Sequence, residues 1–454
     1  MISLLALSVA ATTSVLFLSG VMSGPVRAGT LAVAFGGLGA TLANPRWRAT
    51  LTMRGVMTAS VAITAVAVVA PPAESRDVWS YAFYGRTVVE YGENPYATVP
   101  DDHPDDPYHE LVGSGWRDAP SVYGPVFTGM SIGIMGVAGT NEHVARVLFQ
   151  LVAAAAALGI LLLIARETRS PAAVVALGLN PLMIYSVINS AHNDVLIGLC
   201  VLGGALLATR GRDVPAALVL AAAALVKVSA VLALPALVLW IWYRRGLGRA
   251  AAAAGAAVAT LGVGFALVGG ADAWRPLSRA SAQLSRGSIW QIVRPGAWGR
   301  LFSFAQRAAE PLPSTTAKVA IVATAVFALW LAYTRRRDTT PALALGAALT
   351  AYLLTAAYVL PWYAAWALPV LALRWRAGLS VLVAVQAALW AVAYQYERGL
   401  PLSPANRILW LLAAATIAFN LAAIAALAAS GWRRERDARR SERAVRIATE
   451  ELSA

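Results

Sequence analysis

Residues 143–165 read HVARVLFQLVAAAAALGILLLIA, a predominantly apolar run. A membrane-spanning helix needs about 20 such residues, so this run is long enough to cross a bilayer. Comparable runs recur along the chain at residues 2–21, 28–44, 54–71, 171–188, 193–209, 214–228, 229–243, 250–270, 314–334, 340–360, 362–374, 377–395 and 405–431. Their number and length predict an all-α polytopic membrane protein with about 12–14 transmembrane helices.

Composition supports this fold class. The chain has 454 residues, of which 59% are hydrophobic and 13% are charged. Soluble domains carry about 45–50% apolar and about 25% charged residues, so soluble, fibrous and disordered classes are excluded. The single cysteine, Cys200, lies within an apolar run, which excludes an intramolecular disulfide framework.

Basic residues set the expected orientation in the membrane. They outnumber acidic residues 37 to 23, and nearly all are arginines in short loops between apolar runs. This distribution fits membrane topology rather than nucleic-acid binding, and we expect no nucleic-acid partner. Cytoplasmic loops of membrane proteins carry an excess of Lys and Arg. We therefore expect a multi-pass protein of the cell membrane whose N- and C-termini are both cytoplasmic. Both long polar segments, 72–142 and 271–313, are then extracytoplasmic, and residues 124–138 form a re-entrant or juxtamembrane helix.

This orientation divides the chain into six parts. They are N-terminal spans (1–71), an outer loop that includes the juxtamembrane helix (72–142), a transmembrane core (143–270), a second outer loop (271–313), C-terminal spans (314–431) and a cytoplasmic basic tail (432–454).

The first outer loop is acidic, and Asp77 is its candidate catalytic residue. Asp77 lies where the span 54–71 leaves the membrane, just after Pro71 and Pro72. Partial desolvation there can raise the basicity of a carboxylate, which suits a general base. The alternative is that Asp77 only caps a helix.

The second outer loop is basic and aromatic. Arg275, Arg279 and Arg286 fall on one face of a predicted helix, and Arg294 follows them. Arginine suits oxyanions, so we expect these residues to face the phosphate of a lipid. The alternative is general attraction to anionic membrane lipids together with an interfacial tryptophan belt.

Three further sites lie at membrane edges. His192, Asn193 and Asp194 open the span 193–209, where polar groups are costly unless they face a cavity. Lys227 lies in strongly apolar sequence and must snorkel or pair with a phosphate or with Asp194. Trp362 and Tyr363 follow Pro361 and could either stack on a sugar or anchor the chain at the interface. The alternative for Asn193 and Asp194 is a helix cap.

Short motifs occur in order between about residues 70 and 370. They are RDVWSYAFYGR at 76–86, GENPY at 92–96, WRDAPSVYGP at 116–125, NPL at 180–182, AHND at 191–194, ALVK at 224–227 and PWY at 361–363. Together they resemble GT-C superfamily glycosyltransferases that use polyprenyl-phosphate donors, in particular actinobacterial α-1,6-mannosyltransferases. The resemblance implies a GT-C-like helical bundle whose long first outer loop is catalytic.

The resemblance also implies a reaction. Asp77 is the expected base, polyprenyl-phosphate-mannose the donor, and a lipid-anchored α-1,6-mannan of the lipomannan type the acceptor, with inversion on the extracytoplasmic side. The expected donor and phosphate residues are Arg86, His192, Lys227, Arg279, Arg286 and Arg294. The expected acceptor and sugar residues are Tyr81, Asn94, Tyr96, Trp116, Tyr123, Asn193, Asp194, Trp362 and Tyr363.

No metal or cofactor is implied. The residue two positions after Asp77 is Trp79, so a paired-aspartate metal motif is absent, and the four histidines are dispersed along the chain. Two other functions are weighed against mannosyl transfer: a transporter or flippase of lipid-linked sugars, and a transferase of the same superfamily for another sugar such as arabinofuranose. Transporters usually show internal repeats, which this sequence lacks.

Overall fold

The computed structural model describes residues 4–270, 273, 276, 283–293, 312–395 and 404–453. Within these residues every regular element is helical, which confirms the predicted all-α class. The first part of the chain forms α1 (Leu4–Leu18), α2 (Gly24–Ala43), α3 (Pro45–Ala49), α4 (Met53–Val69), α5 (Asp77–Val89), α6 (Pro125–Ala138), α7 (Glu142–Thr168), α8 (Pro171–Gly178), η4 (Leu182–Asn189), α9 (Asp194–Thr209), α10 (Asp213–Val226), η5 (Val228–Leu232), α11 (Ala233–Arg245) and α12 (Leu247–Ala266). The later part forms η7 (Ile289–Val293), α15 (Ser314–Tyr333), α16 (Ala342–Thr355), η8 (Pro361–Tyr363), α17 (Ala364–Ala372), α18 (Gly378–Ala393) and α19 (Pro404–Ser453).

Several of these helices are long and apolar enough to cross a membrane. Six segments in the described chain pass this test: Gly24–Ala43, Glu142–Thr168, Val228–Arg245, Leu247–Ala266, Ser314–Tyr333 and Arg407–Ser441. The bent pair α8 and η4 adds a seventh if it counts as one span, and shorter apolar helices pack among them. The protein is therefore a multi-pass membrane protein, consistent with a GT-C-like bundle, while the expected count of 12–14 spans stays a prediction.

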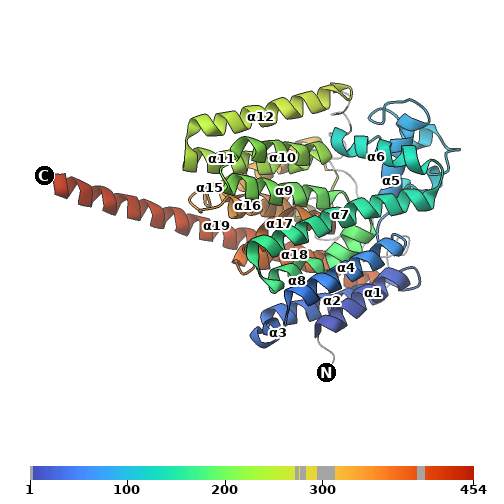
Figure 1. Ribbon diagram of the computed structural model, residues 1–454, viewed down its shortest axis with the longest axis horizontal. Helices are drawn as coiled ribbons and strands as arrows, with labels where there is room; N and C mark the ends of the chain where they lie inside the picture. The colour runs from blue at the N-terminus through green and yellow to red at the C-terminus, as the bar shows by residue number, and fades with distance from the viewer. Residues whose placement is uncertain are drawn as a thin grey trace.

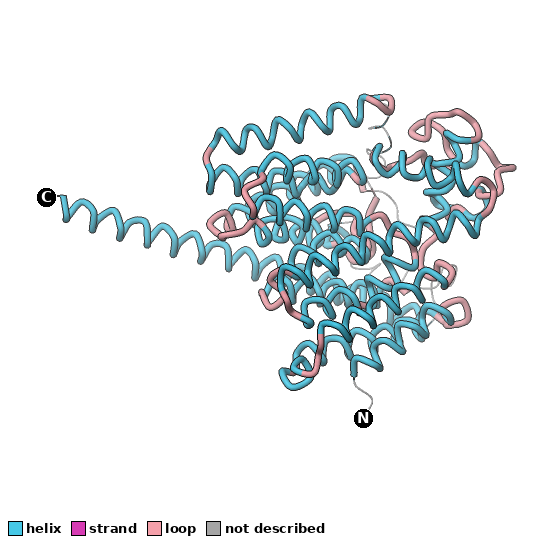
Figure 2. The backbone as a smooth tube through the Cα atoms, viewed as in Figure 1, coloured by secondary structure: helices cyan, strands magenta, loops and turns pink. Residues whose placement is uncertain are grey.

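The long helices run roughly side by side, and α5 and α6 lie together at one end of the bundle (Figure 1). The loop between α5 and α6 lies at that same end (Figure 2). It contains three single-turn helices, η1 (Pro100–Asp102), η2 (His109–Leu111) and η3 (Ser114–Trp116). The short helix predicted at 124–138 is thus observed as α6, packed against α5.

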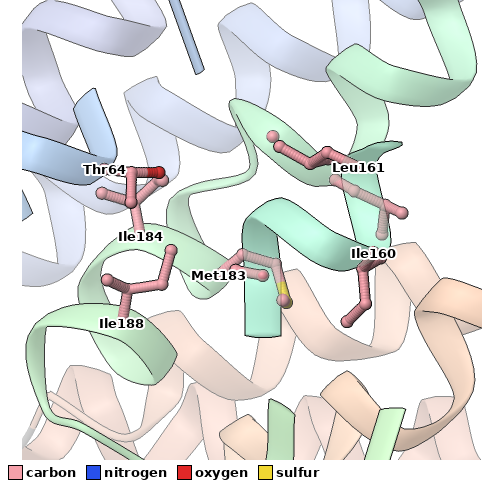
Figure 3. Close-up of a pocket in the computed structure, with 9 residues that line it drawn as sticks. Thr64, Ile160, Leu161, Met183, Ile184 and Ile188 are labelled. Carbon is pink, nitrogen blue, oxygen red and sulfur yellow. The ribbon is translucent and has the colours of Figure 1, made fainter. Parts of the chain in front are cut away.

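A break divides the span predicted at 171–188. The axes of α8 and η4 meet at 49°, with Asn180 and Pro181 at the junction. Proline lacks the N–H that would continue the α-helical hydrogen bonds, and the chain resumes as a π-helix in η4. A small pocket beside this break is lined by Thr64 of α4, Ile160 and Leu161 of α7, and Met183, Ile184 and Ile188 of η4 (Figure 3). Its lining is almost wholly apolar, so it is not the candidate catalytic site.

The C-terminal helix α19 runs without interruption through the boundary predicted at residue 432. A buried ion pair between Arg336 Nη1 and Glu435 Oε1, 2.6 Å apart, joins α19 to the segment that follows α15. Beyond this point the end of α19 projects away from the other helices (Figure 1). The basic tail is therefore a continuation of the last apolar helix rather than a separate element.

Candidate active site at the start of α5

The site is built around Asp77, the first residue of α5. Ser75 Oγ accepts a hydrogen bond from the Asp77 backbone N–H, and Asp77 itself follows the N-cap residue Arg76. The Asp77 Oδ2 atom lies 3.5 Å from Nδ1 of His192, and its side chain is 26% exposed. Asp77 is thus not the N-cap residue, and its carboxylate contacts a second chain segment.

His192 lies in the loop between η4 and α9 and is fully buried. Its Nδ1 atom also lies 3.4 Å from the Tyr81 hydroxyl, and its ring stacks on Trp362 with a centroid distance of 3.8 Å. The preceding residue, Ala191, has a φ of 57°, a left-handed conformation that side chains rarely adopt. Strained backbone of this kind is concentrated at functional sites.

The environment of His192 keeps its ring neutral. Burial, followed by the nearby charge of Lys227, holds the pKa of His192 well below its usual value. Its Nε2 atom is buried and has no hydrogen-bond partner among the described residues. His192 can therefore form a hydrogen bond with a substrate through Nε2, but a neutral ring contributes no positive charge to phosphate binding.

Lys227 supplies a positive charge close to His192. Its Nζ atom lies 3.3 Å from Asp194 Oδ1, which also accepts a 2.6 Å hydrogen bond from Trp366 Nε1. The ammonium group sits 4.0 Å from the ring centroid of Tyr363. The structure thus pairs Lys227 with Asp194, one of the two partners expected from the sequence.

Asn193 and Tyr123 complete this part of the site. Asn193 is 2% exposed, and neither atom of its side-chain amide has a hydrogen-bond partner in the described chain. Tyr123 lies edge-on to Tyr81, with ring centroids 5.0 Å apart, and 5.9 Å from the Lys227 ammonium. An unpaired buried amide costs free energy unless a ligand satisfies it, so Asn193 is suited to bind a substrate hydroxyl.

Other residues predicted to bind sugar form contacts within the outer loop and with its neighbours. Asn94 Oδ1 accepts from the Tyr96 backbone N–H, and the Tyr96 hydroxyl bonds Thr128 of α6 at 3.0 Å. Trp116 lies in η3, partly buried against the main core. The contacts of these three side chains lie within the outer loop, with α6 and with the main core, and their role in sugar binding stays a prediction.

Arg86 is engaged within the loop. Its Nε donates to Asp106 Oδ2 at 2.8 Å, and the Tyr91 hydroxyl donates to the same oxygen at 2.7 Å. The carboxylate of Asp106 thereby balances the charge of Arg86, and the role of Arg86 in phosphate binding stays a prediction.

The second outer loop is only partly described. Arg286 lies in a turn, not on the predicted helix, and its guanidinium lies 4.9 Å from the ring centroid of Trp410. The expectation that Arg286 shares a helical face with its neighbours is therefore wrong, because the chain turns at Arg286 and Gly287. Arg275, Arg279 and Arg294 lie outside the described residues.

Several residues near the site were not singled out from the sequence. Glu74 Oε1 accepts a 2.8 Å hydrogen bond from Gln395 Nε2, and burial raises the pKa of Glu74 to about 7. Arg146, Gln150 and Asn189 bind the chain that leads to Asp77. The available signal was an arginine and a glutamine, four positions apart, inside the apolar run 143–165.

The described residues contain no group of three His, Cys, Asp or Glu side chains that could hold a metal ion. Fold and site together define a polytopic helical membrane protein in which an accessible carboxylate meets a buried imidazole beside a buried lysine–aspartate pair.

Comparison with known proteins places the chain in a family. Residues 3–244 match the family described as "Alpha-(1->6)-mannopyranosyltransferase, N-terminal domain", and the chain belongs to this family. It is 27% identical over 346 residues, 71% of its own length, to Alpha-(1->6)-mannopyranosyltransferase A of Mycobacterium tuberculosis. It is 31% identical over 177 residues, 38% of its length, to Alpha-(1->6)-mannopyranosyltransferase A of Corynebacterium glutamicum. These matches span 65% and 36% of the two relatives.

Proposed function

We propose that this protein is an inverting α-1,6-mannosyltransferase that takes mannose from polyprenyl-phosphate-mannose and adds it to a lipid-anchored α-1,6-mannan. Family membership supports the sugar and the linkage. The observation that carries the proposal is the contact between Asp77 and His192 at the start of α5, because it presents a partly exposed carboxylate beside a neutral ring. The arginine distribution supports an extracytoplasmic site and cytoplasmic termini.

Asp77 acts as the general base. A carboxylate oxygen takes the proton from an acceptor hydroxyl while that hydroxyl oxygen attacks the anomeric carbon of the donor. The bond between the anomeric carbon and the phosphate oxygen breaks on the opposite face, and polyprenyl phosphate leaves with the bonding electrons. A neighbouring carboxylate favours the His192 tautomer that carries its proton on Nδ1. This N–H group holds the Asp77 carboxylate in place.

Lys227 stabilises the leaving phosphate. Its ammonium is held by Asp194 and by the face of Tyr363, so it is in place before the donor arrives. A fixed cation in a buried site stabilises developing negative charge more strongly than a solvated one. Arg279, Arg286 and Arg294 are proposed as further phosphate contacts from the second outer loop.

Polar and aromatic groups of the same site orient the sugars. The unpaired amide of Asn193 offers both a donor and an acceptor to sugar hydroxyl groups. Trp362, Tyr363, Tyr81 and Tyr123 supply the aromatic surface beside it.

The test is transfer of radiolabelled mannose from polyprenyl phosphate to a short α-1,6-mannoside by the purified full-length protein. Asp77→Asn should reduce kcat at least 10³-fold, a loss of about 4 kcal/mol of transition-state stabilisation. Asp105→Asn is the matched control, because Asp105 is an exposed carboxylate of the same outer loop. Transfer by the control should equal that of the wild type and should persist in EDTA.

Three results would overturn parts of the proposal. Full activity of a folded Asp77→Asn protein would exclude Asp77 as the base. Transfer from polyprenyl-phosphate-arabinofuranose alone would change the sugar. Failure of the folded wild type to transfer any lipid-linked sugar, together with movement of such lipids across a bilayer, would favour the flippase.

A further inference from the structure

The end of α4 is capped by side chains from two other segments. The last carbonyl groups of a helix lack partners within that helix, and inside a membrane no bulk water replaces them. Here Arg146 and Gln150 of α7, and Asn189 at the end of η4, all donate to this helix end. The accepting carbonyl oxygens belong to Ala67, Val68, Val69, Ala70 and Pro71.

Asn189 makes the most extensive set of these contacts. Its Nδ2 atom lies 3.0 Å from Ala67 O, 3.1 Å from Ala70 O and 3.0 Å from Pro71 O. Its Oδ1 atom accepts a 2.9 Å hydrogen bond from the backbone N–H of Ala73, which lies beyond the end of α4. Asn189 therefore does more than cap the helix, since it also fixes the first residues of the connection to α5.

Two α7 side chains hold this arrangement. Gln150 Nε2 donates to the Asn189 carbonyl oxygen at 2.7 Å and to Ala70 O at 3.1 Å. Arg146 Nη1 donates to Gln150 Oε1 at 2.9 Å and to Ala70 O at 3.0 Å. Asn189 and Gln150 are fully buried and Arg146 nearly so. Polar side chains at this depth are expensive and usually serve a function.

The network joins the two segments that carry the proposed catalytic pair. Ala73 lies four residues before Asp77, and Asn189 lies three residues before His192. The left-handed Ala191 turns the chain between Asn189 and His192. Both segments are therefore attached to the same hydrogen-bond network within four residues of Asp77 and His192, whose side chains meet at 3.5 Å.

We propose that Asn189, supported by Gln150 and Arg146, is a positioning residue that fixes the separation between Asp77 and His192. The proposal rests on the proposed role of Asp77 as the base. Asn189 does not contact substrate. It acts by preventing the connection between α4 and α5 from moving relative to the loop that carries His192.

The experiment combines kinetics with hydrogen exchange on the full-length protein in lipid nanodiscs. In Asn189→Ala, we expect backbone amides of residues 70–77 to exchange at least tenfold faster than in the wild type. We also expect kcat for mannosyl transfer to fall at least tenfold, with KM for the donor changed less than threefold. Gln150→Leu removes the support from α7 and should give the same changes in exchange and kcat with a smaller amplitude. This second variant tests the proposal if Asn189→Ala fails to fold.

Asn180→Ala is the matched control. Asn180 is a buried asparagine at the break in the same span, and its Nδ2 and Oδ1 atoms bond Ala176 O and the Leu182 backbone N–H, remote from the connection to α5. It should leave both the exchange of residues 70–77 and kcat near the wild-type values.

The two readouts separate the two proposals. Unchanged exchange of residues 70–77 in Asn189→Ala and Gln150→Leu would overturn the positioning role whatever the activity. Faster exchange of these residues with an unchanged kcat would show that the contacts of Asn189 are not needed for mannosyl transfer. Exchange does not depend on turnover, so an inactive wild type would refute the proposed function while the exchange data still decided whether Asn189 holds the connection.

Discussion

At the scale of single residues, the site depends on charges that are buried in compensating pairs. Asp194 is fully buried and Lys227 nearly so, and each is the ion-pair partner of the other. Such a pair adds little net stability compared with apolar residues, but removing one member leaves the other charge without a partner.

Substitution of this pair should therefore show strong coupling. Lys227→Met and Asp194→Asn should each destabilise the protein by about 3–5 kcal/mol, and the double variant should lose less than the sum of the two. Thermal unfolding monitored by tryptophan fluorescence measures these differences. Simple addition of the two single effects would show that the pair is not coupled in the folded protein.

Glu74 should make stability depend on pH. Burial raises its pKa from 4.5 to about 7. Because the folded-state value is the higher one, the stabilising contribution of the protonated acid is complete below pH 4.5 and is lost as the pH rises through 7. The loss is at most about 3.5 kcal/mol, because one unit of difference in pKa corresponds to about 1.4 kcal/mol.

Glu74→Gln keeps a neutral side chain at every pH. Its melting temperature should therefore exceed that of the wild type at pH 8, and the difference should shrink toward pH 5. Asp105→Asn, an exposed acid of the outer loop, serves as the control and should show no such trend. A difference that is constant from pH 5 to pH 8 would exclude Glu74 as the titrating group.

At the scale of helices, close packing between α9 and α17 holds the lysine–aspartate pair. Asp194 opens α9, and Trp366 of α17 donates to it. A Cβ atom at Gly198 of α9 would overlap the carbonyl oxygen of Ala365, whereas one at Gly203 would meet only Val219 Cγ1 at 3.8 Å. The two glycines thus differ in the space available on the same helix.

Gly198→Ala should force the two helices apart and cost about 1–3 kcal/mol. It should also reduce mannosyl transfer, because Trp366 and Asp194 lie on the two displaced helices. Gly203→Ala should leave stability unchanged or raise it, since alanine favours a helix by about 0.5–1 kcal/mol over glycine. Equal melting temperatures for the two variants would contradict the packing argument.

The helices were largely predictable from sequence, but the bend between α8 and η4 was not. Apolar runs locate α7, α9, α12 and α15 because burial in lipid requires long hydrophobic stretches. The same property hides the bend between α8 and η4, because the residues on both sides of it are apolar. The turn at Arg286 was missed because helical periodicity does not report where a chain changes direction.

The residues that meet at the candidate site were easier to single out from the sequence than the contacts between them. Asp77, His192 and Lys227 stand out because charged or titratable groups at a membrane edge are costly. Their contacts join distant segments: Tyr81 and His192 are 111 positions apart. Similarly, the ion pair between Arg86 and Asp106 becomes evident only in the folded loop.

At the scale of the whole molecule, the end of α19 projects away from the helical bundle (Figure 1). The ion pair between Arg336 and Glu435 attaches α19 to the body before the helix leaves it. Deletion of residues 442–454 retains this pair, so the melting temperature and the rate of transfer should both match the full chain. Glu435→Gln should instead lower the melting temperature. Loss of transfer after the deletion would assign the projecting end a direct role in catalysis.

The hydrogen bonds that Asn189 and Gln150 form with residues 67–73 at the end of α4 all go to main-chain atoms. The identity of the side chains there is consequently uncoupled from the placement of the base. Substitution of an exposed side chain of this segment, such as Val69, should therefore leave the contacts of Asn189 and Gln150 with the main chain intact. The exposed positions of this connection can thus drift in sequence over evolution while the placement of the proposed base is inherited.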